Sequence, residues 1–237
     1  MALRILFLSF LAMLLPVSVS AETGKISKVF SCSFLHWDGV PEESYFFFAD
    51  EHYQPVTFMR GSRAGTISLK RVTDFEIYQE KVNGGDGEPQ YQLLAKAPVS
   101  VHINKAVFLV VAPADKETGK YHVVTLDDSI EVFPGAASLF VNLLGEPIKV
   151  NFAGVVKDIK PYESCVMHSG IGPKGGFVPI IVTSSTGDRI YENRLFSQLT
   201  ARKTVIIGPS NKGGSSALVK FVNQLLPQKV PAPPERQ

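Results

Sequence analysis

The chain has 237 residues, a formal net charge of +2 and an aromatic content of 10%, supplied mainly by 16 phenylalanines. So small a net charge does not predict a nucleic-acid partner, and this aromatic, helix-poor composition is typical of β-sheets. The charge is divided unevenly: residues 22–130 contain 11 Lys and Arg against 15 Asp and Glu, whereas residues 131–237 contain 12 against 7. Either the two halves attract each other, or the basic half contacts an anionic envelope polymer, or, as we favour, the charges are simply solvated.

The first 21 residues predict a secretory signal peptide. Arg4 supplies its positive charge, residues 5–15 form a short apolar run, and small residues at 19–21 suit a signal peptidase. The apolar run is shorter than the roughly 20 residues that a membrane span requires. We therefore expect cleavage after Ala21, export to the periplasm or the extracellular space, and no transmembrane segment in the mature chain.

Apolar residues that alternate with polar ones predict strands along most of the mature chain. In chain order, the predicted strands include residues 30–34, 45–49, 75–77, 106–112, 121–126, 148–152, 178–182 and 204–207. The runs at 45–49, 106–112 and 204–207 are apolar throughout, as in strands that are covered on both faces. Glycine-rich or charged loops at 83–87 and 114–119 join neighbouring strands. Many short strands with frequent turns indicate a sandwich or a barrel.

The Phe133-Pro134-Gly135 turn divides the mature chain into two predicted domains, residues 22–133 and 134–226. Each domain has the length and strand density of a β-sandwich, so we expect an all-β protein with two immunoglobulin-like sandwiches in tandem. In residues 215–226 a helical spacing of apolar residues competes with strand-like alternation, and we favour a helix slightly. Residues 227–237 contain four prolines and are expected to be extended or disordered.

No motif in the sequence predicts a catalytic or cofactor site. The glycine spacing at 170–175 matches a dinucleotide-binding loop, but this loop runs into a strand instead of opening a helix. The loop at 208–215 lacks the lysine of a phosphate-binding loop, and the five histidines are too scattered for a local metal site. We therefore predict no catalytic residue, no cofactor and no metal. An enzyme whose site is assembled only in three dimensions remains an alternative.

Two cysteines, Cys32 and Cys165, lie in different predicted domains. An oxidising compartment permits a disulfide between them, which would join the two domains covalently. The alternative, which we favour, is that both thiols act as small apolar side chains.

The His36-Trp37-Asp38 segment contains the only tryptophan of the chain and is a possible binding surface. An exposed aromatic ring at the end of a strand can stack on a sugar or enter a pocket of a partner protein. The alternative, which we favour, is a tryptophan in the core or at the interface between the domains.

Three short segments resemble immunoglobulin-type domains of bacterial envelope proteins to which no activity is assigned. They are residues 137–142, 147–152 and 159–164, within a region of resemblance that spans residues 129–209. In such domains a strand ends at an Asn, a Pro opens the next strand, and a Pro-containing turn precedes a third. The resemblance implies a sandwich fold and an envelope location, but it supplies no site.

The sequence therefore predicts an exported, non-enzymatic interaction or assembly protein of the cell envelope. Its partner would be an envelope protein or a polysaccharide. A carbohydrate-binding protein that uses an exposed Trp37 region is the main alternative, and a burial measurement on Trp37 distinguishes the two.

Overall fold

The computed structural model describes residues 28–60, 62–81, 89–113, 119–210 and 217–226. The predicted signal peptide and proline-rich tail lie outside the described residues, as do the loop at 83–87 and most of the loop at 114–119. Every regular element in the described ranges is a β-strand, which confirms the predicted all-β class.

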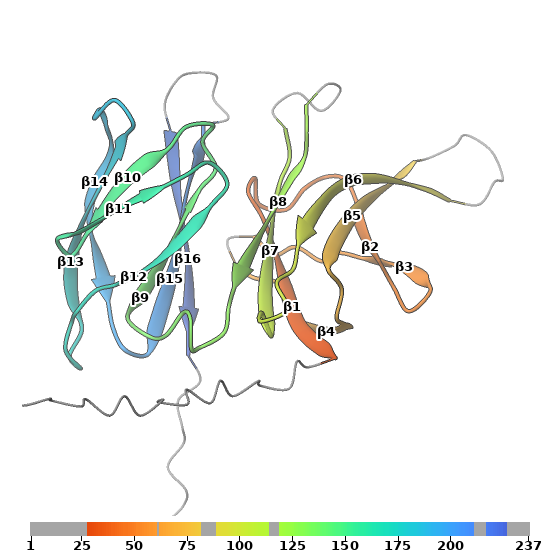
Figure 1. Cartoon of the computed structure of the whole chain (residues 1–237), viewed down its shortest axis with the longest axis horizontal. Coiled ribbons are helices and arrows are strands. Elements are labelled where there is room, and N and C mark those ends of the chain that lie inside the picture. Colours follow the sequence, from red (N-terminus) through yellow and green to blue (C-terminus); the bar gives the residue numbers. More distant parts are fainter. Residues whose placement is uncertain (1–27, 61, 82–88, 114–118, 211–216, 227–237) are drawn as a thin grey trace, which may run out of the picture.

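In the described part of the chain, sixteen strands form four sheets of four strands each (Figure 1). The first eight strands are β1 (Val29–His36), β2 (Tyr45–Ala49), β3 (His52–Pro55), β4 (Ile67–Lys70), β5 (Asp74–Lys81), β6 (Gln90–Pro98), β7 (Lys105–Val111) and β8 (His122–Asp127). The last eight are β9 (Ala137–Asn142), β10 (Ile148–Phe152), β11 (Val155–Ile159), β12 (Ser164–His168), β13 (Gly176–Ser184), β14 (Arg189–Ser197), β15 (Ala201–Pro209) and β16 (Ala217–Leu225).

The two halves of the chain have the same sheet topology. The first half forms the sheets β4-β1-β7-β8 and β3-β2-β5-β6, and the second half forms β12-β9-β15-β16 and β11-β10-β13-β14. Each strand of the second half therefore corresponds to the strand eight places earlier. The directions also agree, because β1 pairs in parallel with β7 as β9 does with β15, while the other pairs are antiparallel. The predicted pair of sandwiches is confirmed, and the two have the same strand order and strand directions.

Each sandwich has its own apolar core between its two sheets. The first core is rich in aromatic rings, with Phe75 stacked on Phe108 at 3.9 Å between ring centroids and Phe34 packed against both. The second core is mainly aliphatic and contains Phe140 and Phe152 in edge-on contact at 5.3 Å. Strand alternation produces both cores, because inward side chains recur at every second residue.

A third apolar cluster joins the two sandwiches. It combines side chains of β1, β7 and β8 with side chains of β9, β15 and β16, and contains Leu35, Trp37, Val107, Leu109, Val124, Leu126, Leu139, Val141, Ile206 and Val222 among others. The sheets β4-β1-β7-β8 and β12-β9-β15-β16 therefore pack on each other, and the molecule is a stack of four sheet layers (Figure 1). The sheets β3-β2-β5-β6 and β11-β10-β13-β14 are the two outermost layers.

Residues 217–225 form strand β16, so the slight preference for a helix was wrong. The strand pairs with β15 over nine residues, from Ala201↔Leu225 to Pro209↔Ala217. Val222 packs into the cluster between the sandwiches, whereas Val219 and Phe221 pack against the second core. Because side chains from both faces of β16 pack against a core, apolar residues occur on both faces, and their spacing imitates the stripe of an amphipathic helix.

Candidate functional site: an aromatic face and its cleft

The structure buries Trp37 and so contradicts the predicted exposed binding surface at His36-Trp37-Asp38. Trp37 is only 2% exposed and lies in the cluster between the sandwiches. The Lys220 ammonium lies 4.0 Å from the centroid of its ring and also donates to its carbonyl oxygen. A Cβ atom on Gly208 would lie 2.7 Å from the ring, so a glycine is needed for this close approach. Trp37 is an interface residue, as favoured from the sequence.

His36 and Asp38, which flank Trp37 in the sequence, do not lie in the cluster between the sandwiches. The His36 ring is half-buried and packs against Phe58 at 5.3 Å and Tyr45 at 5.7 Å in the first sandwich, whereas Asp38 is exposed in the following turn. Alternation along β1 sends adjacent side chains to opposite faces. The three residues therefore do not share one surface.

Cys32 and Cys165 are both free thiols, as favoured from the sequence, so the possible disulfide between the two sandwiches is not formed. Cys32 is fully buried in the core of the first sandwich, and Cys165 is half-buried against the core of the second. The packed inner sheets separate the two cores.

We expect the two thiols to differ in reactivity. Burial raises the pKa of the Cys32 thiol to about 12, so at pH 8 it stays protonated as well as covered. Native protein treated with a thiol reagent should therefore be modified first at Cys165, and Cys32 should react only after unfolding, as peptide mass mapping would record. Equal rates of modification in the native state would contradict the placement of Cys32.

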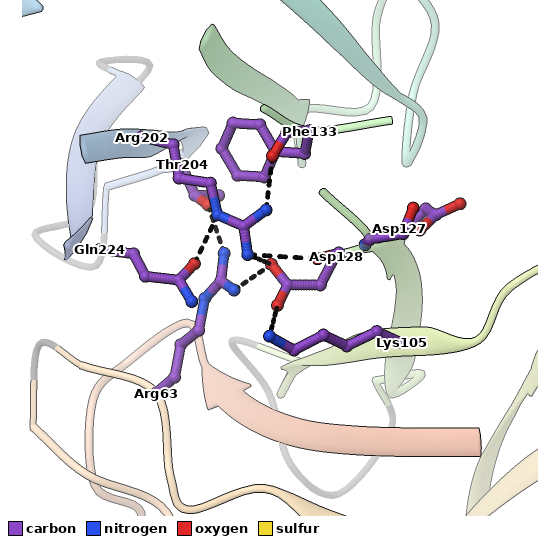
Figure 2. Close-up of polar contacts among 9 residues, drawn as sticks. Arg63, Lys105, Asp127, Asp128, Phe133, Arg202, Thr204 and Gln224 are labelled. Carbon is purple, nitrogen blue, oxygen red and sulfur yellow. Dashed lines mark hydrogen bonds and ion pairs between the residues drawn. The ribbon is translucent and has the colours of Figure 1, made fainter. Parts of the chain in front are cut away.

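Charged side chains form a cluster, centred on the buried Asp128 and Arg202, where the two sandwiches meet (Figure 2). We call Arg63, Lys105, Asp128 and Arg202 the charge cluster. The Asp128 carboxylate, 2% exposed, accepts hydrogen bonds from Arg202 at 2.8 Å and from Arg63, and pairs with Lys105 at 3.2 Å. Arg63 and Lys105 belong to the first sandwich and Arg202 to β15 of the second, so one carboxylate joins both.

Arg202 is held entirely by protein atoms. Its guanidinium donates to the Gln224 side chain at 2.8 Å, to the Phe133 carbonyl and to the Asp128 carbonyl at 3.1 Å, and lies 4.7 Å from the Phe133 ring centroid. Burial lowers the pKa of Arg202, and the Asp128 charge opposes that shift. Because its donors are occupied within the protein, Arg202 links the two sandwiches and is not available to a ligand, and removing its carboxylate partner would leave a buried charge unpaired.

The outer face of the sheet β3-β2-β5-β6 presents a cluster of aromatic side chains, which we call the aromatic face. Its members are Phe46, Phe48, Tyr53, Tyr78 and Tyr91. Tyr53 is central: it stacks on Tyr91 at 3.8 Å between centroids and meets Phe48 and Tyr78 edge-on at 5.1 and 5.0 Å. Phe48 is 53% exposed. The other four rings are half-buried, so the cluster is an aromatic patch that is partly open to solvent, which makes it a candidate interaction site.

A cleft of about 330 Å³ adjoins the aromatic face at the point where β2 and β5 separate. The β2–β5 ladder contains two residue pairs and ends at Phe46↔Tyr78. Beyond that pair, Phe48 and Glu76 line the cleft instead of facing each other across a ladder. A bulge at Leu94 of β6 lies at the same level of the sheet, and bulges increase the local twist of a strand pair.

The cleft has an apolar floor and a charged rim. Leu69 and Phe75 contribute to the floor, and the rim contains the carboxylates of Asp50, Asp74 and Glu76 together with the Lys70 ammonium. Hydrogen bonds from Lys96 and Tyr78 hold the pKa of Glu76 below its usual range, so this carboxylate is ionised at neutral pH. The exposed pair of Asp50 and Lys70, at 2.8 Å, lowers the pKa of Asp50. Lys70 and Lys96 offset two of these three carboxylates, and Asp74 leaves the rim with a net negative charge.

Sequence reasoning missed the aromatic face because residues 45–49 were expected to be covered on both faces. In the structure only Tyr45 and Phe47 of that strand are buried, while Phe46 is half-buried and Phe48 exposed. The available signal was tyrosine at positions 53, 78 and 91, each next to a polar residue on a strand that follows in the chain.

Comparisons with known proteins give no family for the chain. No family model matches it, and no curated protein matches its sequence. Among solved structures, it is similar to the C2A and C2B domains of extended synaptotagmin 2 with a TM-score of 0.21 and 10% sequence identity, over 94% of this chain and 99% of that one. A likeness at this level carries no conclusion about site or function.

Two further findings concern the described residues alone. They contain no helix long and apolar enough to cross a bilayer. They also contain no group of three His, Cys, Asp or Glu side chains placed to hold one metal ion.

Proposed function

We propose that the protein is an exported, non-enzymatic interaction or assembly protein of the cell envelope, and that the aromatic face with its cleft is its docking site. The observation that supports this proposal is the cluster of five touching rings on an outermost sheet layer, open to solvent at Phe48. The predicted signal peptide and the sequence resemblance to envelope domains support the location.

The chemistry of the docking site indicates the chemistry of its partner. Tyrosine and phenylalanine bury large areas with little loss of side-chain entropy, and for this reason they are common at the centres of protein interfaces. The acidic rim of the cleft favours a partner that presents positive charge beside apolar groups. The partner that fits best is therefore a protein surface with exposed apolar side chains and Lys or Arg next to them.

A polysaccharide partner remains the second candidate, now at the aromatic face instead of Trp37. The exposed ring of Phe48 beside the carboxylates of the cleft could stack on a sugar and accept its hydroxyl groups. The mutual stacking of Tyr53 and Tyr91 covers one face of each ring, which favours a protein over a sugar.

We expect substitution of the aromatic face to abolish capture of the partner. Tagged mature protein would be crosslinked in the envelope fraction of its source, and captured protein and sugar would be quantified. The Tyr53→Ala/Tyr91→Ala variant should retain less than about a tenth of the wild-type material, because each central ring contributes more than 1 kcal/mol at a typical hot spot.

Val101→Ser provides a matched control for this capture. Val101 is 45% exposed in the loop between β6 and β7 and lies outside the aromatic face. The Val101→Ser variant should capture as much protein and sugar as the wild type does. Equal capture by the Tyr53/Tyr91 variant would overturn the proposed docking site, and recovery of sugar without protein would replace the protein partner by a polysaccharide.

A further inference from the structure

The outermost sheet of the second sandwich carries an exposed apolar surface of its own. Phe177 of β13 and Phe196 of β14 are paired across the sheet, with ring centroids 5.4 Å apart. They are 69% and 41% exposed. Pro179 and Arg194 form the next outward-facing pair of the same ladder and are also exposed. We call these four residues the Phe177–Phe196 face.

We propose that the aromatic face of one molecule docks on the Phe177–Phe196 face of a second copy, so that the protein assembles head to tail. This inference rests on the proposed function, because it names a second copy of the chain as the partner of the aromatic face.

The charges of the two surfaces are complementary. Beside the aromatic face, β5 presents Glu80 on the same side as Tyr78, and the cleft adds its acidic rim. Within the Phe177–Phe196 face, Arg194 supplies positive charge, and the next outward-facing residue of β14, Glu192, is already paired with Arg189. The first sandwich is acidic and the second basic by residue count, so the long-range field favours the same orientation.

The order of the sheet layers determines whether such a contact can add further molecules. The two inner sheets are covered by each other, which leaves the aromatic face and the Phe177–Phe196 face on the two outermost layers of the stack (Figure 1). The contact joins two different surfaces. After one contact forms, each molecule keeps one unused surface, so the pair still presents one surface of each kind. Heterologous contacts of this type extend into open chains unless their rotation closes a ring. Because the surfaces lie on opposite ends of the stack, the geometry points to an open chain.

The test uses purified mature protein in sedimentation velocity over a range of concentrations. For the wild type we expect a weight-average mass that rises with concentration and passes beyond that of a dimer. Tyr53→Ser/Tyr91→Ser and Phe177→Ser/Phe196→Ser should each weaken association by at least about tenfold, because each removes the central rings of one surface. Val101→Ser and Val132→Ser, at residues exposed elsewhere, should associate as the wild type does.

Mixing the two double variants distinguishes head-to-tail contact from a symmetric dimer. Each variant keeps the surface that the other has lost, so an equimolar mixture should form a heterodimer and nothing larger. Thermal unfolding of each variant close to that of the wild type establishes that the surfaces, not the fold, were changed.

Three outcomes would overturn the inference. They are a wild type that stays monomeric up to about 1 mM, a double variant that still self-associates like the wild type, or a mixture that forms no heterodimer. None of them removes the proposed function, because capture of a different envelope protein that depends on Tyr53 and Tyr91 would still stand.

Discussion

The Asp128→Ala variant should lose about 3–5 kcal/mol of unfolding free energy, since it removes the only carboxylate of the charge cluster and leaves Arg202 buried without its hydrogen-bonded counter-charge. Both side chains are 2% exposed, so water does not replace the lost partner. Urea denaturation at neutral pH would measure the loss. Because the carboxylate joins side chains of both sandwiches, we also expect the transition to broaden or divide as the two sandwiches unfold separately.

Asp127→Ala is the matched control for this prediction. Asp127 is the adjacent residue, and its carboxylate accepts a hydrogen bond from the backbone nitrogen of Ser129 at 2.9 Å. Its loss should reduce the unfolding free energy by about 1 kcal/mol. Asp128→Asn, which keeps the shape without the charge, should fall between the two. Equal urea midpoints for Asp128→Ala and Asp127→Ala would show that the charge cluster does not stabilise the fold.

The Trp37→Ala variant should lose a similar amount, about 3–5 kcal/mol, because it leaves a large cavity between the sandwiches. The ring is 2% exposed and packs against Gly208 and the Lys220 ammonium, so little around it can move in to fill the space. Thermal or urea unfolding would measure the loss. Trp37→Phe, which keeps part of the ring volume, should recover most of it, and an unchanged midpoint for Trp37→Ala would contradict the burial.

Trp37 is also a specific probe, because it is the only tryptophan of the chain. Its native fluorescence should be that of a buried indole and should shift to the red when the sandwiches part. In Asp128→Ala this shift should occur at lower urea than loss of the β-sheet signal in circular dichroism. Coincident transitions in that variant would mean that the two sandwiches unfold as one unit.

Strand positions were predictable from the sequence because alternation directly reports which residues share a face. All eight runs predicted as strands coincide with observed strands, although the exact ends differ by a few residues. Alternation does not report which face meets solvent. For β2 both alternating sets are aromatic or apolar, so the sequence could not show that Tyr45 and Phe47 are inside while Phe46 and Phe48 are outside.

The contacts between the sandwiches were beyond sequence reasoning for a different reason. Asp128, Arg63 and Arg202 are far apart in the chain, and nothing local marks them as partners. The repeated topology was equally hidden, because the two sandwiches share the order and direction of their strands but not a recognisable sequence motif. The helix predicted at residues 215–226 failed because packing on both faces of β16 gave it the spacing of an amphipathic helix.

The parallel pairing of β1 with β7, repeated by β9 with β15, has a consequence for how the chain folds. Ser31 of β1 pairs with Lys105 of β7, so the first strand of the sandwich cannot join its central partner until nearly the whole sandwich has been synthesised. Contacts between residues so distant in sequence slow folding, because the entropy of closing a long loop is lost before the contact forms. Until then the aromatic strands are uncovered and prone to aggregate. A chain that emerges vectorially from its amino end therefore has to wait for the seventh strand of each sandwich before that sandwich can close.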